Sequence, residues 1–451
     1  MNHTIKLIVA TGAAAVVGCA AEKSTPAPTQ CTPAPGTICT VVGNGDPAFY
    51  GDNKSALEAA IYQPVDILSH KDGAMYVVDW SNHKIRQIDK AGIITTVGGI
   101  DGLGDGPDGP ALKHHFNHPT HLTFDSVDNI VISAWHNSKM KLLDLKAGTI
   151  KDFCGTGKRA YAGDGGPAVK ADLDLPSSAA YDKAGNLLFT DQANHLIRRI
   201  KQDGTIESVA GQCIVEQAMT PEGKDWGATK CAEGEVPKKC SDFNGPDGKP
   251  IASQKRFCGN VTDPAMVNPI CQALCTAGFK GDGGPATEAR FAQPTSQSAD
   301  PGGRMVLDAN DNILVADTLN HRIRRIDAKT NIVTTVAGKG QFGVTGGSYS
   351  GDGGKATDAD LNYPTDLEVA KDGTLFIADT YNHCIRKVGT DGVITTFAGQ
   401  CGKKGDEGDG GKPTDARINR PYGIALTKAG DLLIADTNNH RIRMIKGAAA
   451  P

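Results

Sequence analysis

The sequence repeats one phrase six times, and this repetition constrains the fold more than any other feature of the chain. The phrase reads VDWSNHKIRQID at first and returns as TDQANHLIRRI, ADTLNHRIRRID, ADTYNHCIRKV and ADTNNHRIRMI, with SAWHNSKMKLLD as a degenerate copy. Its second position, here called the anchor, falls at intervals of 55, 57, 126, 62 and 57 residues, at Asp79, Ala134, Asp191, Asp317, Asp379 and Asp436. The long interval indicates one ordinary repeat plus an insertion of about 69 residues.

Each copy carries the signals of four short β-strands. A loop related to GDGGPAT comes first, and a proline with a short apolar run follows it. A hairpin such as DKAGNLLFTD, the repeated phrase and a final run such as IVTTVAG complete the copy. Gly, Asn and Asp at the joints are typical of tight turns between strands. Six units of four strands predict an all-β, six-bladed β-propeller, whereas a solenoid normally has fewer strands per repeat.

The two ends of the repeat region predict how the ring closes. The last copy stops after HRIRMIKGAAAP and lacks a fourth strand, while ICTVVG at residues 38–43 is a fourth strand without the other three. We expect this segment to pair with the last blade, because closure removes exposed sheet edges. The prediction places blades one to three in residues 37–211, an insertion in 212–278 and blades four to six in 279–447.

The first 36 residues predict export and anchoring. Residues 1–19 have a short basic start, an apolar stretch and small residues before Cys19, as in a bacterial lipoprotein signal. Lipidation of Cys19 would leave residues 20–36, rich in Pro, Thr and Ala, as a flexible tether. Ala20 then favours the outer membrane of the cell envelope. The alternative is an ordinary cleavable signal that happens to end near a cysteine.

Cysteine usage agrees with export. The chain has 12 cysteines, which fits an oxidising compartment. Cys384 begins the third strand of blade five and Cys401 follows its fourth strand, so antiparallel pairing predicts a bridge between them. Cys31 and Cys39 form a second candidate pair, which leaves Cys154 as the odd thiol.

The insertion is also rich in cysteine. It contains no histidine, so we interpret it as a disulfide-stapled loop and not as a zinc knuckle. Its cysteines allow about 15 connectivities, and the sequence does not choose among them. They are Cys213, Cys231, Cys240, Cys258, Cys271 and Cys275.

The repeated phrase resembles the NHL repeat, and the GDGGPAT loops resemble those of teneurin-type NHL propellers. The resemblance covers about residues 37–446 apart from the insertion, and it implies the six-bladed fold. It implies no single activity, because propellers host many functions. Amidating lyases similar to NHL propellers hold zinc with histidines from several blades, and lactonase-type propellers hold a metal in an acidic cage. Neither pattern transfers to this chain residue by residue.

The repeated polar residues favour a structural role. Five equivalent Asp, Asn and His sets cannot all be active sites in one ring. Asp and Asn cap turns, and we expect the His and Arg of each copy to tie neighbouring blades together. The glycine-rich loops place Asp164, Asp282, Asp352 and Asp409 among glycines, but they lack the regular oxygen ligands and closing Glu of a calcium loop.

A polar ring is predicted at one mouth of the central channel. Each inner strand begins just after the loop proline, and the residues two places later would surround the channel if the blades superpose. These residues are Asp66, His121, Ser178, Ser296, Asp366 and Gly423.

Blade two departs from the repeat and is enriched in histidine. The stretch KHHFNHPTHL holds His114, His115, His118 and His121, and the turn of blade two adds His136 beside Trp135. We take His118, His121 and His136 as candidate ligands for Zn or another divalent metal, with Asp66 and Asp366 completing the set. The same groups suit general acid–base chemistry, and Trp135 suits stacking on a sugar. The alternative is a polar loop without a metal.

The sequence therefore predicts a binding module in preference to an enzyme. The expected function is an exported platform for protein or glycan at the cell envelope, held to the membrane only through its lipid. The alternative is a metal-dependent hydrolase or lyase with its site near blade two. The net charge of −4 without basic clusters argues against nucleic acid as a partner.

Overall fold

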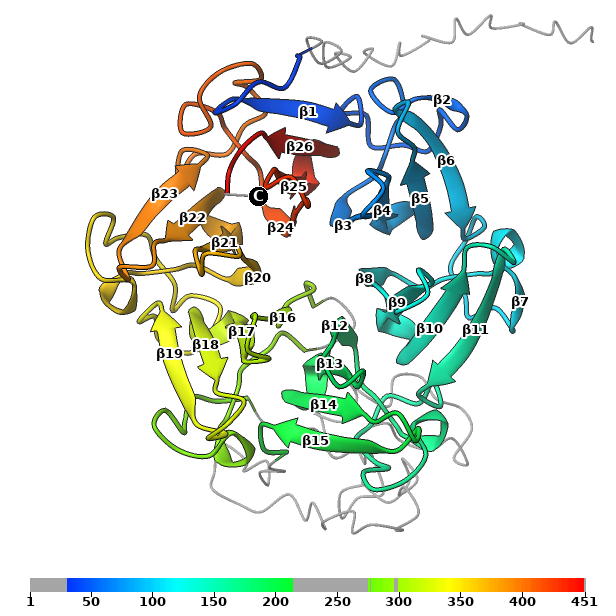
Figure 1. Ribbon diagram of the computed structural model, residues 1–451, viewed down its shortest axis with the longest axis vertical. Coiled ribbons are helices and arrows are strands. Elements are labelled where there is room, and N and C mark those ends of the chain that lie inside the picture. The colour runs from blue at the N-terminus through cyan, green and yellow to red at the C-terminus, as the bar shows by residue number, and fades with distance from the viewer. Residues whose placement is uncertain (1–30, 214–274, 276, 296–298, 450–451) are drawn as a thin grey trace, which may run out of the picture.

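The computed structural model describes residues 31–213, 275, 277–295 and 299–449, and these form six sheets arranged as the blades of a ring (Figure 1). The sequence prediction of an all-β, six-bladed propeller is confirmed. Residues 1–30, most of the insertion and Ser296 lie outside the described residues. No helix among the residues described is long and apolar enough to cross a membrane.

Each blade runs from an inner strand at the axis to an outer strand at the rim. Blade one contains β3 (Pro64–Ser69), β4 (Met75–Asp79), β5 (Lys84–Ile88) and β6 (Ile93–Gly98), with β2 (Lys54–Ser55) on its outer edge. Blade two contains β8 (Pro119–Phe124), β9 (Ile130–Ala134), β10 (Lys139–Asp144) and β11 (Thr149–Cys154), with β7 (Gly109–Pro110) outside. Blade three contains β12 (Pro176–Tyr181), β13 (Leu187–Asp191), β14 (Leu196–Ile200) and β15 (Ile206–Ala210).

The second half repeats the pattern. Blade four contains β16 (Met305–Leu307), β17 (Ile313–Asp317), β18 (Arg322–Ile326) and β19 (Val333–Ala337). Blade five contains β20 (Pro364–Val369), β21 (Leu375–Asp379), β22 (Cys384–Val388) and β23 (Ile394–Ala398). Blade six contains β24 (Pro421–Leu426), β25 (Leu432–Asp436) and β26 (Arg441–Ile445), and its outer strand is β1 (Ile38–Val42).

The first strand closes the ring as the sequence predicts. Strand β1 pairs antiparallel with β26, with Ile38 opposite Ile445 and Thr40 opposite Arg443. The outer strand of blade six therefore comes from the other end of the chain (Figure 1). Neighbouring blades then pack through apolar side chains, such as those of Val78 in blade one and Leu122 in blade two.

Disulfides join the places where the sequence suggested pairing. The structure contains the bridges Cys384–Cys401 and Cys31–Cys39, and it also joins Cys213 to Cys275 at the two ends of the insertion. Cys154 is the free, buried cysteine of the described residues. Burial raises the pKa of its thiol to about 12, so the group stays protonated at neutral pH.

The anchor aspartate organises each blade from within. In blade five, Asp379 accepts hydrogen bonds from the Asn362 N–H (2.7 Å), the Asn382 amide (2.8 Å) and Arg386 (3.3 Å). Arg386 also donates to Asp352 of the glycine-rich loop at 2.6 Å. Burial raises the pKa of Asp379 to about 6 despite these donors. The loop aspartate is thus engaged by arginine, in keeping with the structural role expected from the sequence.

A histidine latch joins successive blades. The imidazole follows a short 3₁₀ turn and sits in left-handed backbone, for example at φ 56° in His440. Its Nδ1 accepts a backbone N–H from the next blade, which explains why these positions hold His. The five latches pair Gln63 with His440 (3.1 Å), His118 with His83 (3.4 Å), Gln293 with His195 (3.1 Å), Tyr363 with His321 (2.9 Å) and Arg420 with His383 (3.1 Å).

Blade two lacks both the anchor aspartate and the latch histidine. Ala134 replaces the anchor aspartate and Ser138 replaces the latch histidine, and the buried Ser138 hydroxyl has no hydrogen-bond partner among the described residues. The buried Lys141 takes the place of the anchor arginine and pairs with Asp105 (2.7 Å) and Asp152 (2.6 Å). The junction between blades two and three is therefore built differently from the other five.

We predict that His440→Ala destabilises the fold and that the cost depends on pH. The substitution leaves the Gln63 N–H unpaired and should lower the free energy of unfolding by about 1 to 3 kcal/mol at pH 7.5. Burial lowers the pKa of His440 to about 4 in the folded chain. Below pH 6.5 the unfolded chain gains protons first, so the native protein loses this stabilisation as pH falls toward 4.

Urea unfolding between pH 8 and 4.5 measures this effect. The difference between native protein and variant should narrow as pH falls. His115→Ala is the matched control, because His115 contacts Gly102 O within its own loop and joins no blades. An equal cost for His440→Ala across this pH range would show that the imidazole does not act as a neutral acceptor.

Candidate functional site

The polar ring on the channel axis contains an arginine that was not among the ring residues predicted from the repeats. Strand β16 pairs Met305 with Val315, just as β20 pairs Leu367 with Ile377, so Arg304 occupies the place of Asp366. Ser296, the residue expected at this position of blade four, lies outside the described residues. Blade four has additional residues between Pro294 and its inner strand, and they shift the ring position by eight (304 − 296).

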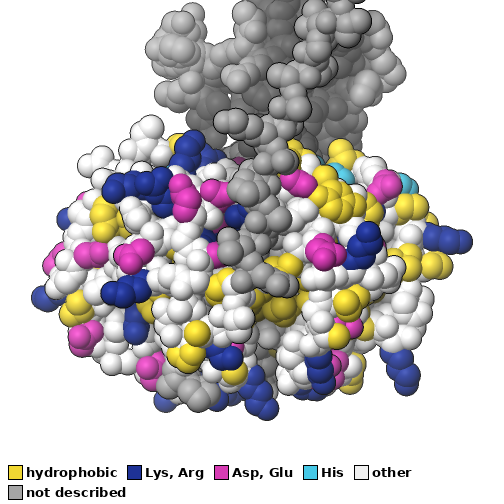
Figure 2. Space-filling model, turned by 90° about the horizontal axis from the view of Figure 1, so that it is seen from above, with side chains coloured by type: hydrophobic (Ala, Val, Ile, Leu, Met, Phe, Trp, Pro, Cys, Tyr) yellow, Lys and Arg dark blue, Asp and Glu magenta, His cyan; other side chains and the backbone are white. Residues whose placement is uncertain are grey.

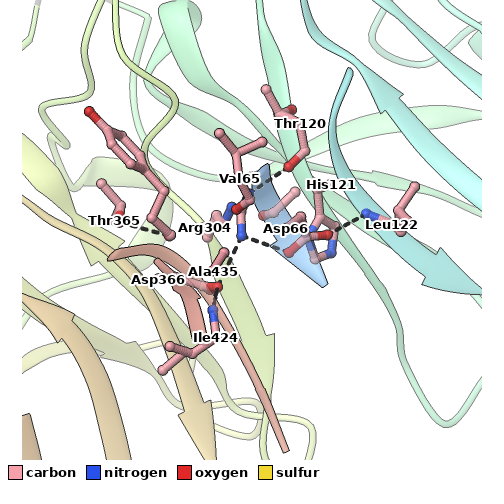
Figure 3. Close-up of polar contacts among 12 residues, drawn as sticks. Val65, Asp66, Thr120, His121, Leu122, Arg304, Thr365, Asp366, Ile424 and Ala435 are labelled. Carbon is pink, nitrogen blue, oxygen red and sulfur yellow. Dashed lines mark hydrogen bonds and ion pairs between the residues drawn. The ribbon is translucent and has the colours of Figure 1, made fainter. Parts of the chain in front are cut away.

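Arg304 crosses the axis and binds groups from three other blades (Figure 3). Its Nη1 donates to Asp66 at 2.7 Å and to Asp366 at 3.0 Å. Its Nη2 donates to the backbone oxygens of Val65 (2.8 Å) and Thr120 (2.5 Å). The side chain is only 1% exposed, so the guanidinium forms a buried plug in the centre of the ring.

Further contacts join the inner strands around this plug. Asp66 accepts from the Leu122 N–H at 2.8 Å, and Asp366 accepts from the Ile424 N–H at 2.9 Å (Figure 3). Ser178 accepts from the Met305 N–H at 3.1 Å. Each of these side chains thus connects its own blade to the following one.

Gly423 and His121 complete the ring. A Cβ on Gly423 would lie 2.3 Å from Val65 O and 2.7 Å from Arg304 Nη1, so only glycine leaves room for the guanidinium. The Nδ1 of His121 lies 3.2 Å from Asp66, and its Nε2 lies 3.1 Å from Ala179 O. The imidazole therefore belongs to the same network.

The two acids of the ring differ in their proton affinity. Burial raises the pKa of Asp366, and Arg304 only partly offsets that effect. Burial acts in the same direction on Asp66, but Arg304 and His121 outweigh it and leave the pKa of Asp66 below its usual range. Asp66, Ser178 and Asp366 are 4% exposed or less. The predicted open polar site at the channel mouth is instead an internal ion-pair network.

A segment of blade four packs on the face that carries the 3₁₀ turns between the second and third strands of the blades, here called the turn face. Gln192 donates to Pro294 O (2.8 Å) and Asp300 O (3.2 Å) and accepts from the Gly302 N–H (3.1 Å). Asp300 also accepts from the Tyr381 hydroxyl at 2.6 Å. These contacts hold residues 299–303 between the turns of blades three and five.

Trp135 has a different role from the one expected. The side chain is fully buried, and its indole N–H donates to Gln192 at 3.1 Å. Its ring packs with Leu175 and Ala193 in a small apolar cluster. Trp135 therefore presents no free face for stacking on a ligand.

The histidines of blade two divide into separate groups. The Nδ1 atoms of His118 and His136 lie 3.1 Å apart, and the ring of His83 lies 4.5 Å from that of His118. His121 instead belongs to the axial network, and the buried His114 contacts Pro107 O at 3.1 Å. In the described parts of the chain, no three His, Cys, Asp or Glu side chains are arranged to hold a metal. The structure thus does not assemble His118, His121 and His136 into one metal site.

Local hydrogen bonds favour neutral imidazoles in this group. The His118 Nδ1 lies 2.9 Å from the Asn117 amide oxygen, which only accepts, so His118 carries its proton there. His136 Nδ1 then accepts from His118, and a neutral His136 is protonated on Nε2. Burial, together with the nearby His118 and Arg159, lowers the pKa of His136 to about 4.

We predict that Arg304→Met is strongly destabilising. The change leaves Asp66 and Asp366 buried without their cation, which should cost about 3 to 5 kcal/mol in the free energy of unfolding. Urea unfolding measures the cost. Arg199→Met is the control, because Arg199 forms a partly exposed pair with Glu207 that should contribute about 1 kcal/mol or less.

A triple variant tests the cause of that loss. Adding Asp66→Asn and Asp366→Asn to Arg304→Met removes the unpaired charges and should recover most of the lost stability. A triple variant as unstable as Arg304→Met would show that the packing of Arg304, and not its charge, holds the axis.

Comparison with known sequences supports the repeat family. A family model described as the teneurin NHL domain matches residues 27–137 and 304–407, and one described as the NHL repeat matches 419–443. Teneurin-4 of Homo sapiens is 25% identical over 442 residues, which cover 91% of this chain. SUPPRESSOR OF QUENCHING 1 of Arabidopsis thaliana is 27% identical over 284 residues, which cover 61% of this chain and 25% of that protein. The chain spans only 13% of the length of teneurin-4.

Solved structures share the fold. An auxiliary nutrient binding protein from Bacteroides ovatus superposes with a TM-score of 0.54 at 13% identity, covering 90% of this chain and 76% of that one. A protein of the same description from Bacteroides thetaiotaomicron gives 0.54 at 15% identity, covering 90% and 75%. With the six blades and the family matches, the chain is an NHL-repeat β-propeller of the teneurin type.

Proposed function

We propose that this propeller is a non-enzymatic binding platform, exported and anchored by lipid in the cell envelope, that recognises protein or glycan through its turn face. The closed axis carries the proposal. Arg304 fills the centre of the ring, and residues 299–303 are held by the turns of blades three and five on the turn face. We therefore expect ligands on the outer surface of the ring, because the described side chains at its axis are engaged with one another.

The alternative was a metal-dependent hydrolase or lyase near blade two. Such an enzyme needs an acid, a base and a reacting centre within reach of one another. The ring acids are paired with Arg304, and the candidate metal ligands belong to two groups of contacts. This arrangement favours binding over catalysis.

The loops of the turn face suit recognition. Residues 99–108 and 339–348 form irregular loops that pack against the turns of blades two and four. They expose Leu103 (58%), Phe342 (56%) and Val344 (61%). Exposed side chains on loops held by a rigid ring are typical of binding surfaces. The descriptions of two structural neighbours as nutrient binding proteins support the same proposal.

Nucleic acid is not the proposed partner. On the edge of the ring seen in Figure 2, basic and acidic side chains are interspersed, so this view has no continuous basic surface. Phosphate backbones require clustered Lys and Arg. The net charge of −4 agrees with this interpretation.

Attachment to the membrane through lipid on Cys19 is tested by the substitution Cys19→Ser. If Cys19 is lipidated, the native chain should incorporate radiolabelled palmitate and fractionate with membranes. The variant should lose the label and leave the membrane fraction, because it lacks the acceptor thiol. Cys154→Ser is the control, since Cys154 is buried in the ring and should not affect fractionation. If Cys19→Ser still associates with membranes, the proposal that lipid on Cys19 attaches the chain to the membrane is wrong.

Binding is tested by co-sedimentation of the oxidised chain, produced without residues 1–19, with cell-envelope fragments. We expect the chain to sediment with the fragments equally well with and without EDTA, because the proposed recognition needs no metal. Fragments pretreated with protease distinguish a protein partner from a glycan. Absence of sedimentation with untreated fragments would contradict the platform.

A further inference from the structure

The junction of blades one and two carries a partly exposed aromatic surface on the turn face. We call it the seam surface and define it by Gln63, Trp80, Ser81, His118 and His136. All five residues are partly exposed. The ring centroids of Trp80 and His118 lie 4.6 Å apart, and the Ser81 hydroxyl donates to Gln63 at 2.7 Å. Aromatic rings and polar side chains are thus combined in one small area.

Trp80 differs from its equivalents in the other blades. In each blade a 3₁₀ turn joins the second strand to the third, and its first residue is Trp80, Trp135, Gln192, Thr318, Thr380 or Thr437. Trp80 alone among these six is partly exposed, and the other five are buried. The repeat thus tolerates threonine at this position, whereas the indole of Trp80 packs partly against two apolar clusters and remains partly exposed.

The hydrogen bonding of Trp80 supports this conclusion. Thr380 donates to Pro421 O (2.6 Å), Thr437 donates to Pro64 O (2.7 Å) and Trp135 donates to Gln192. The indole N–H of Trp80 and the Nε2 of His136 are buried and have no partner among the described residues. A buried donor without a hydrogen-bond partner lowers the free energy of unfolding. The presence of Trp80 is therefore not explained by hydrogen bonding within the fold.

The charges around the seam surface are neutralised. Lys84 pairs with Asp101 (2.7 Å), Lys139 pairs with Asp105 (2.6 Å), and Arg159 pairs with Asp174 (2.6 Å). His136 is neutral because its Nδ1 accepts from His118, and burial lowers the pKa of His118 below its usual value. This surface therefore favours an uncharged ligand over an anion or a cation.

We infer that the seam surface binds a neutral saccharide, with a sugar ring stacked on Trp80 and hydroxyl groups bonded to the polar side chains beside it. A sugar combines apolar ring faces with many hydroxyls, which is the complement of an indole flanked by Gln63, Ser81 and imidazoles. This inference rests on the proposed function. Of the two proposed ligand classes, protein and glycan, it selects glycan and assigns the seam surface as its binding site.

The test is titration of the oxidised chain with maltohexaose, cellohexaose, chitohexaose and laminarihexaose, followed by calorimetry and tryptophan fluorescence. At least one sugar should bind. Trp80→Ala should weaken its binding by about tenfold or more, because stacking is lost. Trp80→Phe keeps a smaller aromatic ring and should fall between Trp80→Ala and the native chain.

Phe342→Ala is the matched control, because Phe342 is an exposed aromatic side chain on another loop of the turn face. It should bind sugar like the native chain. Circular dichroism and urea unfolding verify that each variant is folded. If Trp80→Ala binds sugar as well as the native chain does, the site does not lie at the seam surface. If none of the four sugars binds, the saccharide assignment is wrong.

The envelope experiment separates these failures from failure of the platform itself. If no sugar binds but the chain sediments with envelope fragments in a protease-sensitive way, the platform stands and the saccharide inference is wrong. If neither sugars nor fragments bind, both proposals are wrong. Sugar binding lost in Trp80→Ala, with protease-resistant sedimentation, supports both.

Discussion

The ring depends on one repeated contact, in which the Nδ1 of a turn histidine accepts a backbone N–H from the next blade. The contact joins parts of the chain that are not neighbours within a sheet, and in His440 it spans the point where the two ends meet. It requires a neutral imidazole, because a protonated Nδ1 cannot accept. The anchor aspartate and its arginine hold the turn that presents the imidazole, so order within a blade supports order between blades.

Blade two shows what happens where this contact is absent. Ala134 and Ser138 replace the anchor and the latch, and Lys141 with two acids stabilises the blade instead. His118, whose N–H completes the preceding latch, also bonds to His136 in the turn of blade two. The crowding of histidines in KHHFNHPTHL thus reflects several roles: His118 at the seam, His121 on the axis and His114 within a loop.

The sequence predicted the fold well because its repeat is strong and each copy carries its own turn signals. The axial ring was predicted less well. The loop proline precedes the anchor by 15 residues in blade five (Pro364 to Asp379) but by 23 in blade four (Pro294 to Asp317), and this difference was the available signal for Arg304. The sequence contained no comparable signal for the burial of Trp135, because the residue type alone does not show whether a tryptophan packs inside the fold or faces solvent.

Closure of the axis also determines which positions of the repeat can accept different side chains. Arg304 binds blades one, two and five, so the ring residues that face it are constrained by charge and by space, as Gly423 illustrates. The first positions of the turns are constrained less, since Trp, Gln and Thr all occur there. Trp80 is the one partly exposed residue among them, so a change there alters the turn face without removing a latch or an axial contact. A repeat fold of this kind can therefore acquire a binding surface at one seam while the other seams preserve the ring.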